Sequence, residues 1–287
     1  SFFSRRLGFL GAFGGCYAQG TRKQALAVSR FLVWEPTMNK SFILPSATSI
    51  RHHIERALRI QINRGSIHGY RDCPDLARSG CRIEVVFDVG ANVGQSADKF
   101  SDEFPGAHVH SFEPVSGTFR TLTQRLRRRN NVSCHRLALA STNGQATLYL
   151  TGGPDSNSVT NSLIRPPHSV GSETVETCTI DSFVLKNGIP RIDLLKIDAE
   201  GADLDVLVGA RNMLASKNVA FVLTEVGFHP GDTRHVLFDD VRSYLLPLGF
   251  YVFGIYDQQP EWSGEQRLRF ANVCFANEQA FQTSLSG

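Results

Sequence analysis

The sequence lacks several patterns that would assign it at once to a common class of protein. Its six cysteines include no Cys-x-x-Cys pair, which argues against a zinc ribbon and against a disulfide framework. A reducing, cytoplasmic compartment is therefore the simpler prediction. The chain has no internal repeat and no low-complexity tract, and it is 41% hydrophobic, so fibrous repeats and disorder are excluded.

A long hydrophobic run is missing as well. The apolar stretch from Leu7 to Ala18 is too short to span a bilayer. It follows Arg5 and Arg6, an arrangement that resembles the first two regions of a signal peptide, although several glycines weaken its helical character. Export or membrane association through this segment is the alternative to a cytoplasmic protein.

Charge is distributed unevenly along the 287 residues. Residues 1–80 contain 12 of the 30 Lys and Arg residues but only four acids, which gives this segment a formal charge of +8 and leaves −5 for the rest. A basic arm on an acidic body is typical of contact with phosphates, anionic lipid or acidic glycans, and a solvated helical face would explain it equally well. We expect residues 1–80 to form a partly helical extension.

After residue 80, short apolar runs alternate with amphipathic stretches, the pattern of a mostly parallel sheet with helices on both faces. We therefore expect an α/β domain over residues 81–287. Residues 144–178 fit neither rhythm, and we expect a strand over 146–150 followed by a polar loop. The other expected strands span 83–89, 107–112, 132–137, 192–198, 219–225, 249–255 and 270–276, and the expected helices span 94–103, 116–129, 203–215 and 235–246.

The first strand runs into a glycine turn that contains Asp88, Gly90, Asn92 and Gly94. Glycines let the backbone approach a ligand, and the following helix offers free N–H donors. The dinucleotide pattern G-x-G-x-x-G is absent, and so is the Gly-Lys-Ser/Thr of a phosphate loop. An acid at the end of this strand suits a ligand that carries an ammonium group better than a pyrophosphate.

Glu113 ends the second strand, 25 residues after Asp88. An acid at this position can accept hydrogen bonds from both hydroxyls of a ribose. Either acid alone is more simply explained as a loop carboxylate. Together they favour an adenosine-type ligand without phosphates.

A third group of charges lies on Lys196, Asp198 and Glu200. Because strand side chains alternate, these three side chains are expected on one face, where such charges are costly unless paired or exposed in a cleft. Asp198 and Glu200 are then expected to line a crevice at the carboxyl end of the sheet. The structural alternative is a Lys196–Asp198 ion pair that only fixes the strand end.

These residues together resemble the FkbM-type methyltransferases over roughly residues 81–277. The resemblance rests above all on the Lys-Ile-Asp-Ala-Glu-Gly-Ala sequence at 196–202. It also rests on the glycine turn at 88–94, on Phe-Glu-Pro at 112–114, on Thr-Ile-Asp-Ser-Phe at 179–183, on Thr-Glu-Val at 224–226 and on Asn-Val-Cys-Phe at 272–275.

The resemblance implies the class I, Rossmann-like methyltransferase fold, with seven strands of which the last is antiparallel. It also implies S-adenosylmethionine as cofactor and O-methylation of a sugar, glycolipid or polyketide hydroxyl. Carried over to this chain, the cofactor contacts are Asp88 and Gly90 for the methionine end, Asn92 and Gly94 for the turn, Glu113 for the ribose, and Leu137 and Ala138 for the adenine.

Methyl transfer to a hydroxyl requires a proton acceptor, for which Asp198 and Glu200 are the first candidates, with Lys196 orienting them. Glu225, at the tip of the next strand, and His229 are further candidates. Asp198, Glu200 and Glu225 also offer the oxygen ligands that Mg²⁺ prefers, so a divalent metal remains open.

The expected partner is a small-molecule or glycan acceptor. If this acceptor is anionic, the basic arm would suit it, and the arm could also contact a membrane surface. No nucleic-acid-binding module is visible. Two other functions stay open. One is a noncatalytic protein that binds an adenosine ligand or acts as a scaffold. The other is a nicotinamide-dependent oxidoreductase, for which the missing G-x-G-x-x-G is a counterargument.

Overall fold

A computed structural model describes residue 76 and residues 81–151, 160–162, 169–232, 234–260 and 267–280. Apart from Leu76, the expected N-terminal extension lies outside the described residues. Leu76 is buried, and it belongs to the same apolar cluster as Val86 and Phe100. Among the described residues, no helix is long and apolar enough to cross a membrane.

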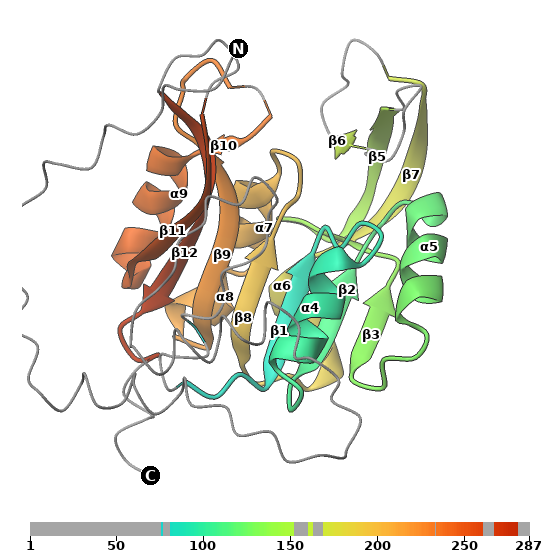
Figure 1. Ribbon diagram of the computed structural model, residues 1–287, viewed down its shortest axis with the longest axis horizontal. Coiled ribbons are helices and arrows are strands. Elements are labelled where there is room, and N and C mark those ends of the chain that lie inside the picture. Colours follow the sequence, from blue (N-terminus) through green and yellow to red (C-terminus); the bar gives the residue numbers. More distant parts are fainter. Residues whose placement is uncertain are drawn as a thin grey trace, which may run out of the picture. The chain divides into compact units, whose positions relative to one another are not determined.

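The central sheet is mostly parallel, as expected (Figure 1). Its last strand, β12, pairs antiparallel with both of its neighbours, and the short strand β10 (Val236–Leu237) is added beside β9. In spatial order, the other strands are β3 (Val132–His135), β2 (His108–Phe112), β1 (Val85–Val89), β8 (Ile192–Ile197), β9 (Val219–Gly227), β12 (Leu268–Asn277) and β11 (Phe250–Pro260).

The strand order creates a switch point between β1 and β8. The chain proceeds from β1 to β2 and β3 on one side, and later from β8 to β9 on the other. Connections therefore leave the carboxyl ends of β1 and β8 in opposite directions. Open α/β sheets bind their ligands at such a point.

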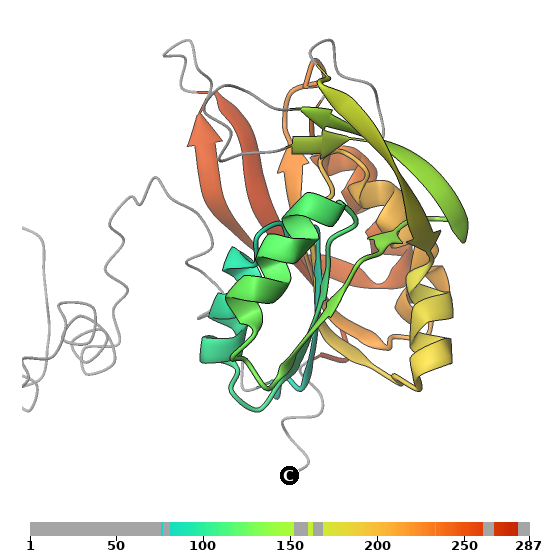
Figure 2. The same ribbon diagram turned by 90° about the vertical axis from the view of Figure 1, so that its right-hand side faces the viewer.

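Both faces of this sheet are covered by helices (Figure 2), because its strands are apolar on both sides. Val86 and Leu194 pack with α4 (Gln95–Glu103) and α5 (Ser116–Leu126) on one face. On the other face, Phe87 and Leu195 belong to a cluster with residues of four helices: α6 (Ile180–Asn187), α7 (Asp203–Gly209), α8 (Arg211–Ala215) and α9 (Phe238–Leu245). Helix α9 continues into the short 3-10 helix η1 (Leu246–Leu248).

A second, four-stranded sheet corrects the interpretation of residues 144–178. It consists of β4 (Ala138–Leu139), β7 (Gly171–Cys178), β5 (Gly144–Thr151) and β6 (Thr160–Ser162). The expected strand at 146–150 is confirmed within β5, but the polar loop is wrong at β6 and β7. In β7 the buried Val175 and Thr177 alternate with the exposed Glu176, because one face of this sheet meets water.

The Thr-Ile-Asp-Ser sequence at 179–182 builds the start of α6, which the sequence analysis did not predict. The Thr179 hydroxyl caps the helix by accepting a hydrogen bond from the Ser182 amide at 3.0 Å. The Asp181 carboxylate accepts bonds from the amides of Asn212 and Met213 at 2.9 and 3.0 Å, at the beginning of α8. This motif therefore joins two helices and lies away from the site described below.

Candidate active site

A cavity opens at the carboxyl ends of β1, β2 and β8, and strands β4, β5 and β7 form its opposite wall. Seven residues that the sequence singled out line it: Gly90, Asn92, Glu113, Leu137, Ala138, Asp198 and Glu200. Five others, Asp88, Gly94, Lys196, Glu225 and His229, are not among its lining residues. The switch point thus brings together residues that are more than 100 positions apart in the chain.

The glycine turn lies directly against the end of β8. Gly90 has a φ of +71°, and a Cβ there would lie 1.9 Å from the carbonyl oxygen of Asp198, so only glycine fits. Gly94, with a φ of +89°, begins α4 and packs so closely on α5 that a Cβ would lie 2.9 Å from Leu122 Cδ1. Close packing against backbone therefore requires glycine at position 90, while the positive φ favours it at position 94, and only Gly90 lines the cavity.

Asp88 is buried beneath this turn. Its carboxylate accepts hydrogen bonds from the Ser96 hydroxyl at 2.9 Å and forms an ion pair with Lys196 Nζ at 3.1 Å. Its side chain is fully buried, so direct contact with a bound cofactor stays a prediction. What the geometry does show is that Asp88 anchors Lys196.

Lys196 ties the turn to the end of β8. Its ammonium group lies 3.4 and 3.3 Å from the carbonyl oxygens of Val89 and Gly90 and 3.5 Å from the Asp198 carboxylate. The Lys196–Asp198 ion pair considered in the sequence analysis is therefore present. Since the Lys196 side chain is only 3% exposed, it orients groups around the cavity without opening onto it.

Glu113 is the buried carboxylate of the cavity wall. One of its oxygens accepts a hydrogen bond from the Asn92 amide at 3.2 Å, and the other accepts one from the Val115 amide at 2.9 Å. Burial raises the pKa of Glu113 to about 7 against the effect of these two bonds. Each oxygen retains a further acceptor site, so this carboxylate can bind two neighbouring hydroxyl groups.

Part of the cavity lining is apolar. Leu137 and Ala138 line it from the segment after β3, and Ala146 and Leu148 of β5 line the opposite wall. These side chains form a surface suited to a flat heterocycle. Because β5 contributes to it, the second sheet is part of the binding site.

Acidic groups collect past the end of β8. The strand ends at Ile197, so Asp198 and Glu200 lie in the turn that follows and not on the strand face that the alternation predicted. Burial, and then the charge of Asp198, raise the pKa of Glu200, whose carboxylate lies 3.5 Å from Arg234. Asp203 is buried behind them with a pKa raised to about 7 by burial.

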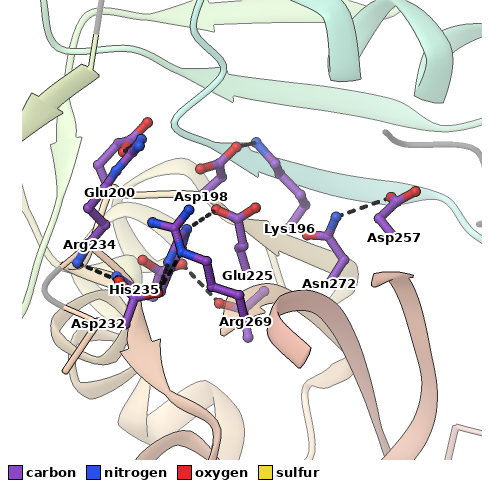
Figure 3. Close-up of polar contacts among 12 residues, drawn as sticks. Lys196, Asp198, Glu200, Glu225, Asp232, Arg234, His235, Asp257, Arg269 and Asn272 are labelled. Atoms are coloured by element: carbon purple, nitrogen blue, oxygen red, sulfur yellow. Dashed lines mark hydrogen bonds and ion pairs between the residues drawn. The ribbon is translucent and has the colours of Figure 1, made fainter. Parts of the chain in front are cut away.

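The two further catalytic candidates lie apart from each other. Glu225, in β9, contacts His235, whose Nε2 lies 3.0 Å from the Glu225 carboxylate (Figure 3). His229 is exposed, and its Nδ1 accepts a hydrogen bond from the Gly231 amide at 3.0 Å. The structure thus puts His235 beside the acids, where the sequence had suggested His229, because the turn after β9 folds back on the strand.

His235 was missed because its position gave no signal in the sequence. It lies at the start of a segment expected to be helical from 235 to 246, whereas α9 begins only at Phe238. The acidic neighbour three residues earlier, Asp232, was the one available hint, since its carboxylate binds the His235 ring at 2.7 Å.

Divalent metal binding finds no geometric support in the residues that the structure covers. Within them, no group of three or more His, Cys, Asp and Glu side chains is arranged to hold a metal ion. The acids at the ends of β8 and β9 are instead paired with Lys196, Arg234 and His235.

The sequence around this cavity matches a known protein family. Residues 88–252, more than half of the chain, match the methyltransferase FkbM domain. The chain belongs to the FkbM methyltransferase family. The strand order, with its antiparallel β12 between β9 and β11, is that of the class I methyltransferase fold.

Three curated relatives resemble this chain in part of their length. The hexuronic acid methyltransferase AglP of Haloferax volcanii is 32% identical over 155 residues, which are 54% of this chain and 61% of the relative. The 2-O-methyltransferase NoeI of Sinorhizobium fredii is 24% identical over 49% of this chain and 62% of its own length. The 31-O-demethyl-FK506 methyltransferase FkbM of Streptomyces tacrolimicus is 29% identical over 45% and 60%. The match thus spans about three fifths of each relative.

Proposed function

We propose that this chain transfers the methyl group of S-adenosylmethionine to a hydroxyl oxygen of a sugar, glycolipid or polyketide-type acceptor. The observation that carries this proposal is the set of residues that line the cavity. In the order of the strands that carry them, these are the apolar Leu137 and Ala138, then the buried Glu113 carboxylate with spare acceptor sites, and then the acids Asp198 and Glu200. Membership of the FkbM family supports it.

Each part of the cavity fits a different part of S-adenosylmethionine. Glu113 would accept hydrogen bonds from the two ribose hydroxyls, and Leu137 and Ala138 would contact the adenine. The Gly90 turn and Asn92 would hold the methionine end. When bound, the cofactor supplies an electrophilic methyl group on a positively charged sulfur, and the acids beyond β8 favour a cation at this place.

The residues around the cavity contribute mainly by positioning. Holding an acceptor oxygen against the methyl group can lower the barrier by about 7–11 kcal/mol. Lys196 and Asp88 fix the turn and Asp198, and so define the space that the acceptor enters. The acceptor hydroxyl must lose its proton, and a carboxylate next to this space can take it.

The relatives' names and the charge of residues 1–80 support the proposed acceptor class. Two of the relatives are named as hexuronic acid and 2-O methyltransferases, and the third is named for a hydroxyl of FK506. The basic residues of the segment 1–80 favour an anionic acceptor, such as a uronic-acid glycan, or an anionic surface that presents it. An anionic acceptor predicts a KM that rises with salt.

Binding and turnover test the proposal separately. Calorimetry should show saturable binding of S-adenosylmethionine and none of NAD. Labelled methyl transfer should then be measured on a panel that includes methyl glucuronoside, methyl glucoside and a macrolide alcohol. Absence of saturable S-adenosylmethionine binding at millimolar concentration would refute the proposed function, and binding without transfer to host-cell extract would favour a noncatalytic protein.

A further inference from the structure

One histidine beside the cavity is held between two carboxylates. His235 Nε2 lies 3.0 Å from Glu225 Oε2, and His235 Nδ1 lies 2.7 Å from Asp232 Oδ2. The ring of Phe270 stacks on the imidazole with 4.6 Å between centroids and 19° between planes. The imidazole is therefore fixed at both nitrogens and on one face, and its side chain is only 8% exposed.

The two partners decide the charge of this ring. A carboxylate only accepts hydrogen bonds, so both ring nitrogens must carry a proton to satisfy Glu225 and Asp232 together. Burial alone would lower the pKa of His235, but the hydrogen bonds and charges of Glu225 and Asp232 outweigh it, and the pKa is raised. Burial likewise tends to raise the pKa of Asp232, yet the His235 bond lowers it.

Glu225 connects this histidine to the cavity. Thr224 of β9 pairs with Ile197 of β8, so Glu225 and Asp198 follow one residue further along neighbouring strands. Figure 3 shows Asp198, Glu225 and His235 lying together. The Glu225 charge also raises the pKa of Glu200 and Asp203, as expected for acids that share one site.

The surroundings of the cluster contain few other charges. Arg269 Nε lies 3.9 Å from Asp232, and its guanidinium lies 5.7 Å from the centre of the Phe270 ring. Asn272 of β12 pairs in register with Glu225, and its amide donates to Asp257 at 3.1 Å. His235 is the cation that contacts Glu225 at 3.0 Å, and the charge of Glu225 acts on the acids Glu200 and Asp203.

Two acids that line the cavity, Asp198 and Glu200, and the neighbouring Glu225 differ in their contacts with cations. Asp198 lies 3.5 Å from Lys196, and Glu200 lies 3.5 Å from Arg234, whose side chain is 54% exposed. Glu225 has the shortest contact, 3.0 Å, and its partner is itself fixed from behind by Asp232. Its own side chain is 28% exposed, so part of the Glu225 carboxylate is open to solvent although Glu225 does not line the cavity itself.

We infer that Glu225 takes the proton of the acceptor hydroxyl, and that His235, anchored by Asp232, is the positioning residue that holds the Glu225 carboxylate in place. This inference rests on the proposed function. In the step, the acceptor O–H bond breaks, its proton bonds to Glu225, and the oxygen forms the bond to the methyl carbon. The methyl–sulfur bond breaks with its electron pair left on sulfur, so the carboxylate and the sulfonium both become neutral.

Kinetics of His235→Gln in the full chain test the positioning role. We expect kcat for methyl transfer to methyl glucuronoside, or to the panel acceptor that is turned over, to fall by about tenfold or more. Loss of the cation leaves Glu225 among acids, so the pH of half-maximal kcat should rise by about one unit. Affinity for S-adenosylmethionine should stay within a factor of about three. The matched control is His108→Gln, an exposed histidine bonded to Ser133 on the far strands β2 and β3.

The remaining variants separate the outcomes. Glu225→Gln should lower kcat by about 100-fold with unchanged cofactor affinity. A His235→Gln enzyme with wild-type kcat and pH profile would overturn the inference while the proposed function stands. If that variant fails to fold, Asp232→Asn decides: the same shift of the pH profile supports the inference, and an unshifted profile refutes it.

A spectroscopic measurement needs no acceptor. The His235 signal in ¹⁵N imidazole NMR spectra at pH 7 is identified by its absence from the spectrum of His235→Gln. In the wild-type chain this signal should report protons on both ring nitrogens, and in Glu225→Gln it should report a neutral His235 ring. A singly protonated His235 ring in the wild-type chain at pH 7 would overturn the inference even if S-adenosylmethionine binds, whereas loss of cofactor binding would count against the proposed function alone.

Discussion

Replacing Lys196 with methionine tests the buried ion pair on which the cavity is built. The Lys196 ammonium group lies 3.1 Å from the Asp88 carboxylate, and the two side chains are 3% and 0% exposed. Methionine fills a similar space but carries no charge. The variant therefore leaves Asp88 buried with the Ser96 hydroxyl as its remaining described partner.

The expected loss is large because water cannot reach the carboxylate. Breaking a buried pair by removing one partner costs about 3–5 kcal/mol, against a total stability of about 5–15 kcal/mol for a domain. Changing Asp88 to asparagine as well removes the second charge, so the double variant should be more stable than the sum of the single losses predicts. We expect a coupling energy of about 2 kcal/mol or more.

Urea unfolding, followed by circular dichroism at pH 7, measures these values for Lys196→Met, Asp88→Asn and the double variant. Lys186→Met, at an exposed lysine in the last turn of α6, is the control and should change the free energy of unfolding by about 1 kcal/mol at most. Losses that add within about 0.5 kcal/mol would refute the argument, since independent sites add in this way.

Three other changes should affect the site or the fold. Gly90→Ala should abolish S-adenosylmethionine binding and destabilise the fold, because its φ of +71° and a Cβ 1.9 Å from Asp198 O both exclude a side chain; binding calorimetry and thermal melting check this. Glu113→Gln should weaken cofactor binding by about 10-fold or more, since an amide offers one acceptor oxygen where two backbone donors converge. Burial, with the charges of His108 and His135, lowers the pKa of His110 to about 4 in the folded chain. The unfolded chain therefore binds a proton at His110 more tightly than the folded chain does, and the free energy of unfolding falls as pH drops from about 6.5 to about 4. His110→Phe should remove about 1–2 kcal/mol of that fall after allowance for partial exposure, and parallel stability curves for both proteins would contradict this.

The main elements could be predicted because their signals are local. The expected strand at 192–198 and the observed β8 (Ile192–Ile197) agree within one residue, since four of its six residues are buried Ile and Leu, as in a parallel strand covered on both faces. The predicted helix 203–215 is divided into α7 and α8. Strand β7 escaped detection because half of its residues face water and read as loop.

The candidate site was predicted less completely than the fold. Gly90, Glu113 and Asp198 line the cavity as expected, because acids and glycines at the ends of parallel strands meet at the switch point. The wall contributed by β5 and the contact of His235 with Glu225 were not predicted. Both depend on segments that return to the sheet after irregular connections, which carry no periodic pattern.

The sequence by itself determined where the main strands lie along the chain, the glycine turn and the presence of acids near the strand ends, because hydrophobic period and glycine conformation are properties of neighbouring residues. Only the tertiary structure decided which of these acids serve a ligand. Asp88 lies near the end of β1 and Glu113 directly after β2, yet Asp88 is buried against Lys196, 108 positions away, while Glu113 faces the cavity. The environment of a charge is set by distant residues that pack around it, and that environment decides whether a carboxylate stabilises the fold or binds a substrate.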